Sequence, residues 1–179
     1  RTRRDSYDKE DYYCFIGRLS FEKGIETLIE AARTLPYHLK IIGGGPLADI
    51  LKEKAKGANI EFTGHKEWPE IKEIVGKARF SVVPSEWYEN CPFSVIEAQY
   101  YGTPVIASRI GGTVELIKEG MTGEFFEPGN QKELEEKIRN LWGDSERLEE
   151  YTRNCKETDF LNLDKYCEKL LQIYGGLKA

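Results

Sequence analysis

The side chains best suited to chemistry gather in one stretch, residues 84–98, which reads P-S-E-W-Y-E-N-C-P-F-S-V-I-E-A. Two carboxylates in it, Glu89 and Glu97, are separated by seven residues. A carboxylate can accept hydrogen bonds from both hydroxyls of a ribose diol. Two carboxylates could instead form a glycosidase acid/base pair, which needs a separation of about 5–9.5 Å. The spacing in the sequence does not decide between these uses.

A second candidate stretch, residues 17–24 (G-R-L-S-F-E-K-G), carries two cations, Arg18 and Lys23. Gly17 allows a ligand to approach the backbone closely, and the planar guanidinium of Arg18 matches phosphate oxygens. Lys23 would stand at a helix start, where the helix dipole disfavours a cation unless an anion faces it. On these residues alone, a diphosphate site and a pair of solvated surface charges are equally compatible with the sequence.

Weaker signals come from glycine-rich turns and from single side chains. The turn at 43–46 (G-G-G-P) lacks the spacing of a dinucleotide-binding loop, and Gly111-Gly112 fits either an anion site or an ordinary tight turn. Trp87 and Tyr88 are interpreted as packing in a cleft wall rather than as a platform for a sugar. His65 is interpreted as a loop histidine rather than a catalytic base.

The elements that must position these residues alternate between strands and helices. Apolar runs predict strands over residues 12–16, 38–42, 60–62, 80–83, 104–107 and 123–126. Helical spacing predicts helices over residues 24–35, 48–56, 69–77, 92–101, 114–118, 131–142, 147–158 and 163–174. The alternation predicts one α/β domain over residues 1–179: a Rossmann-like, doubly wound parallel sheet of about six strands, with helices on both faces and a helical C-terminal tail.

The helix predicted over residues 92–101 starts where the candidate carboxylates lie. Asn90 suits an N-cap and Pro92 suits the first turn. Such a helix start presents free backbone N–H groups to an anion or a hydroxyl. Because parallel strands end at the same edge of a sheet, the glycine-rich and charged junctions that follow the strands should converge there as a binding cleft.

Composition restricts the classes of partner. The net charge of −5, from 31 acidic and 26 basic residues, argues against a nucleic-acid-binding protein, which needs a basic face. The four cysteines form no Cys-x-x-Cys pair and only two histidines are present, so no metal site is predicted. We interpret the chain as an intracellular protein from a reducing compartment.

Taken together, the motifs resemble those of the retaining nucleotide-sugar glycosyltransferases of family four, the glycosyl transferases group 1. They are G-R-L-S-x-x-K-G at 17–24, G-G-G-P at 43–46, F-T-G-H at 62–65, P-S-x-x-x-E-N-x-P-F-S-V-I-E-A at 84–98, G-T-P-V-I-A at 102–107 and G-G-x-x-E-L-I at 111–117. The resemblance implies the C-terminal, donor-binding half of a two-domain GT-B enzyme. It also implies an N-terminal acceptor-binding domain that this chain lacks, in cis or as a separate chain.

The resemblance assigns roles to individual residues. It implies that Arg18 and Lys23 grip the donor diphosphate, that Glu97 holds the ribose hydroxyls and that Glu89 lies beside the transferred sugar. Arg18, Lys23 and Glu89 are the implied catalytic residues. The other implied donor-binding residues are Gly17, Gly43, Gly45, His65, Lys66, Asn90, Cys91, Pro92, Phe93 and Ser94.

The resemblance also implies the reaction: retaining transfer of a hexose, with no tightly held metal and no cofactor beyond the nucleotide-sugar donor. The W-Y-E-N-C-P wording is similar to mannosyltransferases of cell-surface polysaccharide assembly, which favours GDP-mannose and leaves UDP-sugars open. A sugar-nucleotide epimerase of GT-B shape and a non-catalytic nucleotide-sugar-binding module are the alternatives.

Location and the chain's end follow from the same resemblance. It implies a cytoplasmic enzyme and leaves open a peripheral contact of the complete enzyme with the membrane through the missing domain. The tail, residues 159–179, is expected to pack toward that domain through an apolar stripe of Leu163, Tyr166, Leu170 and Ile173.

Overall fold

Six parallel strands form a single sheet in the order β3-β2-β1-β4-β5-β6. The structure, a computed structural model, describes residues 8–158 together with 167–168, 171–172 and 174. The strands are β1 (Tyr12–Ile16), β2 (His38–Ile42), β3 (Ile60–Gly64), β4 (Ser81–Val83), β5 (Val105–Ser108) and β6 (Gly123–Phe126). This is the strand order of the doubly wound nucleotide-binding fold, so the predicted fold class is confirmed.

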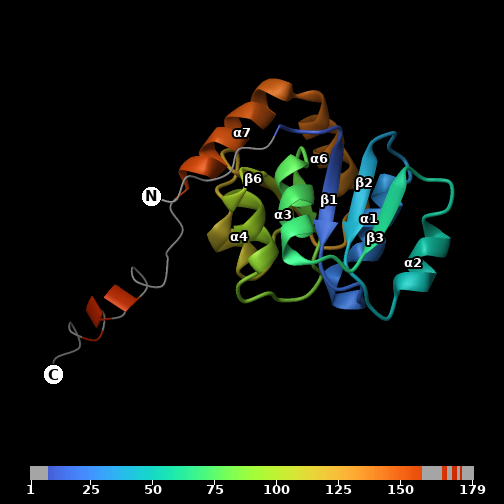
Figure 1. Cartoon of the computed structure of the whole chain (residues 1–179), viewed down its shortest axis with the longest axis horizontal. Helices are drawn as coiled ribbons and strands as arrows, with labels where there is room; N and C mark the ends of the chain where they lie inside the picture. Colours follow the sequence, from blue (N-terminus) through green and yellow to red (C-terminus); the bar gives the residue numbers. More distant parts are fainter. Residues whose placement is uncertain (1–7, 159–166, 169–170, 173, 175–179) are drawn as a thin grey trace.

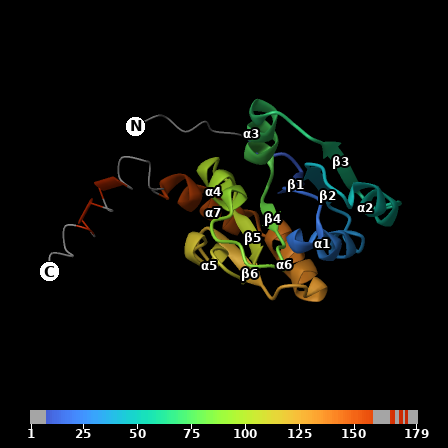
Figure 2. The same ribbon diagram turned by 90° about the horizontal axis from the view of Figure 1, so that it is seen from below.

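Helices connect the strands and cover both faces of the sheet (Figures 1 and 2). They are a 3₁₀ turn η1 (Phe21–Lys23), α1 (Ile25–Ala32), α2 (Ala48–Lys54), α3 (Trp68–Lys77), α4 (Phe93–Tyr100), α5 (Thr113–Leu116), α6 (Gln131–Gly143) and α7 (Ser145–Glu157). Each helix predicted between residues 24 and 158 is present, with ends shifted by a few residues. The four residues of the predicted tail stripe lie outside the described residues.

The sheet separates two apolar cores, and the strands contribute to them alternately. Tyr13 and Phe15 of β1 belong to the core under α1 and α6, whereas Tyr12 and Cys14 belong to the core under α3 and α4. Successive side chains of a strand point to opposite faces, so a strand buried on both faces is a continuous apolar run. Buried area of this kind stabilises a fold by roughly 25 cal/mol per Å² of apolar surface.

The start of α4 differs from the prediction. The N-cap residue is Pro92, in extended conformation, and no side chain caps the helix. Asn90 therefore does not serve as the N-cap, and this prediction was wrong. The reason is tertiary: a loop that follows β5 holds the backbone of residues 89 and 90, as described below, so the chain enters the helix two residues later.

Two side-chain caps fix the last helices. Asn130 Oδ1 accepts a hydrogen bond from the Glu133 amide at 3.2 Å, and Asp144 Oδ1 accepts one from the Arg147 amide at 3.0 Å. The second cap turns the chain sharply after α6, and α7 then lies across the end of the sheet where the strands begin (Figure 1). In the described part of the chain, no helix is long and apolar enough to cross a membrane.

Candidate functional site

The candidate site lies where the strand order reverses, between β1 and β4. β1 and β4 are neighbours, yet α1 packs on one face after β1 and α4 packs on the other face after β4. At such a point, open α/β sheets bind ligands in a crevice outside the carboxyl ends of the strands, between the two following loops. Both loops lie at the lower edge of the molecule in Figure 1.

The loop after β1 turns Arg18 outward. The next residue, Leu19, is only 1% exposed, and its amide donates to the Gly44 carbonyl at 2.9 Å. This buried anchor fixes the loop while Arg18 stays exposed. Within the described residues, the guanidinium of Arg18 makes no ion pair and no side-chain hydrogen bond, so it is available to a ligand.

Lys23 and Glu89 meet across the crevice. Lys23 Nζ lies 2.5 Å from Glu89 Oε1, and Ser85 Oγ donates to the same carboxylate oxygen at 2.8 Å. The Lys23 and Glu89 side chains are 30% and 19% exposed, so the pair is partly shielded from solvent. The residues predicted to contact the diphosphate and the sugar thus form an ion pair with each other.

Further contacts join the same two loops. The Glu86 amide donates to the Glu22 carbonyl at 3.0 Å, and Thr27 Oγ1 donates to Glu86 Oε1 at 2.5 Å. Gly24 has φ of +61°, and a Cβ there would stand 1.8 Å from the Pro84 carbonyl oxygen. Only glycine fits this contact, so Gly24 allows the loops to approach as closely as they do.

The turn at Gly111-Gly112 packs against the carboxylate loop, the loop after β4 that carries Glu89. The Gly112 amide donates to the Glu89 carbonyl at 2.6 Å. A Cβ on Gly112 would lie 2.0 Å from the Asn90 carbonyl oxygen, and one on Gly111 would lie 2.5 Å from that of Glu89. The Gly112 amide therefore holds the backbone carbonyl of Glu89, and the turn fixes the position of the loop that carries Glu89.

The second glycine turn backs the loop after β1. A Cβ on Gly43 would lie 2.0 Å from the Gly17 carbonyl oxygen, and one on Gly45 would lie 2.4 Å from that of Leu19. These glycines and Gly17 are therefore brought together in the structure.

His65 and Lys66 follow the edge strand β3. His65 is exposed, and Lys66 Nζ pairs with Glu70 Oε1 at 2.9 Å. Across residues 8–158, no side-chain hydrogen bond or ion pair joins these two residues to the loops after β1 and β4.

Glu97 lies in α4 and is partly buried. Burial raises the pKa of its carboxyl group above the ordinary value, because desolvation disfavours the charged form. No cation or side-chain donor in the described part of the chain compensates this cost. A partly buried carboxylate without a partner is suited to accept hydrogen bonds from ligand hydroxyls.

The tip of the carboxylate loop is exposed. Trp87, Tyr88 and Phe93 are 69%, 76% and 71% exposed. The prediction that Trp87 and Tyr88 pack in a cleft wall was therefore wrong for the domain as described. Asn90 and Cys91 are exposed, Ser94 is partly buried and Pro92 is buried.

Some residues of the site were not predicted. Ser85, Glu86 and Thr27 join the loops, but small polar residues at strand ends are too common to stand out. The available signal was the position of Ser85, 1% exposed and directly after a buried strand. A hydroxyl that is buried at such a point needs a partner, and Glu89 provides it.

The strand order defines a doubly wound α/β protein with a Rossmann-like sheet. Residues 1–158 match the family Glycosyl transferases group 1, and the chain belongs to that family. An uncharacterized glycosyltransferase of Methanocaldococcus jannaschii is 32% identical over 156 residues, which cover 84% of this chain and 44% of that protein. A GDP-mannose-dependent alpha-mannosyltransferase of Corynebacterium glutamicum is 31% identical over 166 residues, or 92% of this chain and 40% of the relative.

Solved structures agree on the fold. Anabaena HepE in complex with UDP superposes with a TM-score of 0.82 at 21% sequence identity, covering 94% of this chain and 50% of the HepE chain. The likeness shows that this chain has the same α/β architecture as the matched part of HepE. The chain spans less than half the length of the two curated relatives named above.

Proposed function

We propose that this chain is the donor-binding, C-terminal half of a retaining glycosyltransferase that moves a hexose from a nucleotide-diphosphate sugar to an acceptor. The observation that carries the proposal is the Lys23–Glu89 pair at the reversal point of the sheet. A cation and a carboxylate that meet at the carboxyl ends of β1 and β4 match a ligand with both a diphosphate and sugar hydroxyls.

The cations would act on the diphosphate. Arg18 has no partner within the described residues, and Lys23 needs only to exchange Glu89 for a phosphate oxygen. In a transfer reaction the diphosphate departs with growing negative charge, which positioned cations stabilise. Arg18 and Lys23 are thus proposed as catalytic groups as well as binding groups.

The carboxylates would act on hydroxyls. We assign Glu97 to the ribose diol because its carboxyl group is partly buried and lacks a partner in the described residues. We assign Glu89 to the transferred sugar, because release from Lys23 would leave its carboxylate beside the diphosphate site. Backbone amides at residues 90, 91, 93 and 94, next to the start of α4, would bind sugar hydroxyls or phosphate.

The favoured donor is GDP-mannose. The favouring observations are the W-Y-E-N-C-P wording of residues 87–92 and the relative named as a GDP-mannose-dependent mannosyltransferase. A UDP-sugar is the other candidate, since the HepE structure contains UDP. We further propose that the acceptor site is supplied by a preceding domain, that the enzyme works in the cytoplasm, and that any membrane contact is made through that domain.

One alternative keeps the ligand but removes the reaction. A non-catalytic nucleotide-sugar-binding module would have the same donor crevice. Incubating the chain, an acceptor domain and the donor, and analysing the products, separates the two: a transferase yields a glycoside and a module yields none.

The test of donor binding is a calorimetric panel of GDP, UDP and ADP, each with its nucleoside and its sugar conjugates. We expect one site per chain and tightest binding of GDP-mannose or GDP. The matched controls are guanosine and uridine, which lack the diphosphate. Binding of no nucleoside diphosphate at millimolar concentration would contradict the proposal, as would nucleosides that bind as tightly as their diphosphates.

A further inference from the structure

Two donors from different segments converge on one oxygen of Glu89. The hydroxyl of Ser85, from the loop after β4, donates to Glu89 Oε1 at 2.8 Å. The ammonium group of Lys23, from the segment after β1, lies 2.5 Å from the same oxygen. Within the described residues, the other oxygen, Oε2, makes no hydrogen bond and no ion pair. The carboxylate is therefore held through one oxygen, and the second oxygen is available to a ligand.

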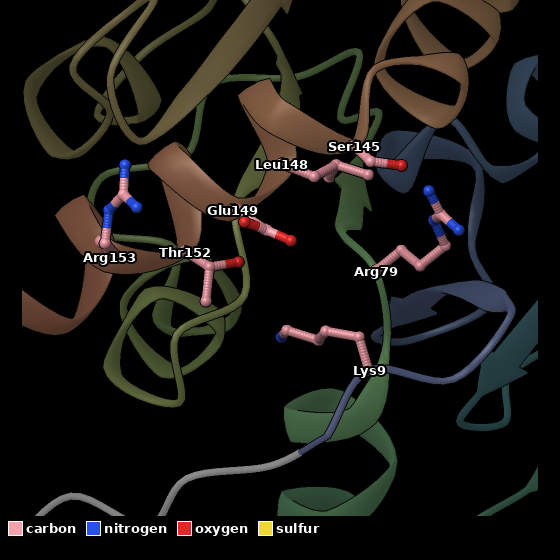
Figure 3. Close-up of a pocket in the computed structure, with 7 residues that line it drawn as sticks. All are labelled: Lys9, Arg79, Ser145, Leu148, Glu149, Thr152 and Arg153. Atoms are coloured by element: carbon pink, nitrogen blue, oxygen red, sulfur yellow. The ribbon is translucent and has the colours of Figure 1, made fainter.

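Such convergence is absent from the cavity between α7 and the segments before β1 and β4 (Figure 3). Lys9 extends into that cavity, whereas the guanidinium groups of Arg79 and Arg153 lie at its opposite ends and turn away from Lys9. The three cations therefore cannot share one small ligand. At Glu89, in contrast, the polar groups already meet at a single atom, and a binding site needs its groups held in place in this way.

Ser85 is held rigidly by its neighbours in the chain. It follows β4 with one residue between, and it is 1% exposed. On one side, the carbonyl oxygen of Pro84 would lie 1.8 Å from a Cβ on Gly24, so the two segments touch there. On the other side, the Glu86 amide donates to the Glu22 carbonyl at 3.0 Å. The Ser85 hydroxyl therefore has a fixed position at the end of a buried strand.

Lys23 is the movable partner of Glu89. Its ammonium group stands at the end of a flexible four-carbon chain, and its side chain is 30% exposed. When a diphosphate draws Lys23 away, as the proposed function requires, Ser85 is the one of these two donors that stays. The Gly112 amide continues to hold the Glu89 carbonyl at 2.6 Å. The position of Glu89 is thus maintained without Lys23.

Release of Lys23 leaves the Glu89 carboxylate free to bind hydroxyl groups. A carboxylate can accept about four hydrogen bonds, and Ser85 would then use one of them. The remaining capacity, including all of Oε2, suits neighbouring hydroxyls of a hexose. A glutamate side chain loses rotamer freedom when it is immobilised, and this loss opposes binding. Because Ser85 has already fixed the carboxylate, less freedom remains to be lost when the sugar binds.

We propose that Ser85 is a positioning residue for the transferred sugar. It holds the Glu89 carboxylate through Oε1 while Lys23 turns to the diphosphate, and it leaves Oε2 to accept hydrogen bonds from sugar hydroxyls. Ser85 itself acts through Glu89 and does not contact the donor. This inference rests on the proposed function. It predicts that affinity for the nucleoside diphosphate is independent of Ser85, whereas the affinity added by the sugar depends on it.

The experiment titrates the full chain with GDP and GDP-mannose, and with UDP and UDP-glucose, by calorimetry. The pair of ligands that the parent binds more tightly is then used for the variants. The Kd of the nucleotide divided by the Kd of its sugar conjugate measures the contribution of the sugar. Ser85→Ala should lower this ratio roughly five- to tenfold, as expected for an anchoring hydrogen bond to a charged group. The Kd of the nucleotide itself should stay within about twofold of the parent.

Ser20→Ala is the matched control. Ser20 is 5% exposed, and its hydroxyl donates to Glu22 Oε1 at 2.6 Å, so this variant also removes a buried hydroxyl from a carboxylate. It should leave the ratio unchanged. A double variant tests whether Ser85 acts through Glu89. Once Glu89→Ala has lowered the ratio, adding Ser85→Ala should lower it no further, because residues that act through one contact are not additive.

Several results would overturn the inference. An unchanged ratio for Ser85→Ala, or equal weakening of the nucleotide and its sugar conjugate, would show that Ser85 has no specific effect on the sugar. An equal fall in the ratio for Ser20→Ala, or a further fall in the Glu89→Ala background, would place the effect outside the Ser85–Glu89 contact. Failure of the proposed function is seen separately, because the parent chain would then bind neither nucleotide.

Discussion

Lys23 and Glu89, which are 66 residues apart in the chain, form one short ion pair across the crevice between the loops after β1 and β4, with 2.5 Å between Nζ and Oε1. Ser85 binds the same carboxylate oxygen, so Glu89 is held in this position from two sides. Under the proposed roles, the diphosphate must displace Glu89 from Lys23 before both groups can contact the donor. The ion pair therefore joins a proposed diphosphate-binding cation to a proposed sugar-binding carboxylate.

This competition predicts that Glu89→Gln binds nucleoside diphosphates more tightly than the parent, by a factor of roughly 2–5, which corresponds to an ion pair of up to about 1 kcal/mol. The reason is that Lys23 no longer has an anionic partner to give up. Calorimetry with GDP and UDP measures it. Glu115→Gln is the matched control, since it removes one charge from an exposed residue of α5. Unchanged or weaker binding by Glu89→Gln would show that the pair persists in the complex.

Arg18→Ala should weaken a nucleoside diphosphate by about 1.5–3 kcal/mol, the cost of losing one hydrogen bond to a charged group. Affinity for the nucleoside should hardly change, because only the phosphates contact the guanidinium. The comparison of diphosphate with nucleoside is made by calorimetry, and Arg139→Ala provides a control for net charge. Equal losses for the two ligands would remove Arg18 from the diphosphate site.

The sheet could be predicted from the sequence because its signals are local. A strand buried on both faces is an unbroken apolar run, as residues 12–16 of β1 are, and the strands β1 and β2 are followed directly by Gly17 and Gly43. Alternation of such runs with helical segments leaves few topologies other than a parallel sheet. The residues of the crevice were likewise found by their positions at the ends of strands.

The remaining features depend on tertiary contacts, which local rules cannot provide. Asn90 is a residue type favoured at N-caps, yet its backbone is packed against Gly112. The N-cap of α4 is therefore Pro92, two residues later. Trp87 has a large apolar side chain of the kind usually found in a core, yet it is 69% exposed. The Lys23–Glu89 pair joins two loops that are far apart in the sequence. Neither loop contains a local pattern that predicts contact with the other.

Gly24→Ala tests whether the two loops must touch. Its Cβ would lie 1.8 Å from the Pro84 carbonyl, so the loops must separate, and we expect a loss of about 2–4 kcal/mol in the free energy of unfolding. Gly57→Ala is the matched control: its φ is +81°, but nothing lies within 4 Å of the added Cβ, so only the backbone strain of about 1–2 kcal/mol remains. Urea denaturation measures both. Equal losses in the free energy of unfolding for the two variants would mean that the loops can separate at Gly24 without destabilising the fold.

Glu97→Gln tests how the Glu97 carboxyl group affects the pH dependence of stability. The carboxyl group has a raised pKa in the folded state, so it binds a proton more readily there than in the unfolded chain. Its stabilising contribution is therefore complete below the unfolded pKa and is lost as pH rises through the folded pKa. The variant should lose less stability than the parent between pH 4 and pH 7, as measured by thermal unfolding at each pH.

The same variant should bind a ribonucleoside diphosphate more weakly, while affinity for the 2′-deoxy analogue changes little. An amide oxygen accepts a hydrogen bond from a diol less strongly than a carboxylate does. Parent and variant are compared by titration with GDP and 2′-deoxy-GDP. If the variant distinguishes the two sugars as well as the parent does, then Glu97 does not contact the ribose diol.

The last prediction concerns turnover by the chain alone. We expect the chain to fold and to bind a nucleoside diphosphate, since the sheet, both apolar cores and the donor crevice all lie within the described residues. We expect negligible transfer of sugar. Catalysis requires donor and acceptor to be held together, and orientation can lower the barrier by about 7–11 kcal/mol. With the crevice open to water, any residual reaction should be slow hydrolysis of the donor.

The measurement is glycoside formation from GDP-mannose, with the chain alone and with a cognate acceptor-binding domain added. The exposed aromatic rings of Trp87, Tyr88 and Phe93 are where that domain should pack, because nothing in the described part of the chain covers them. Replacing Trp87 by Ser should therefore lower transfer by the mixture while leaving calorimetric binding of GDP within about twofold of the parent. Transfer by the isolated chain at ordinary enzyme rates, about 1–10³ per second, would show that no second domain is needed.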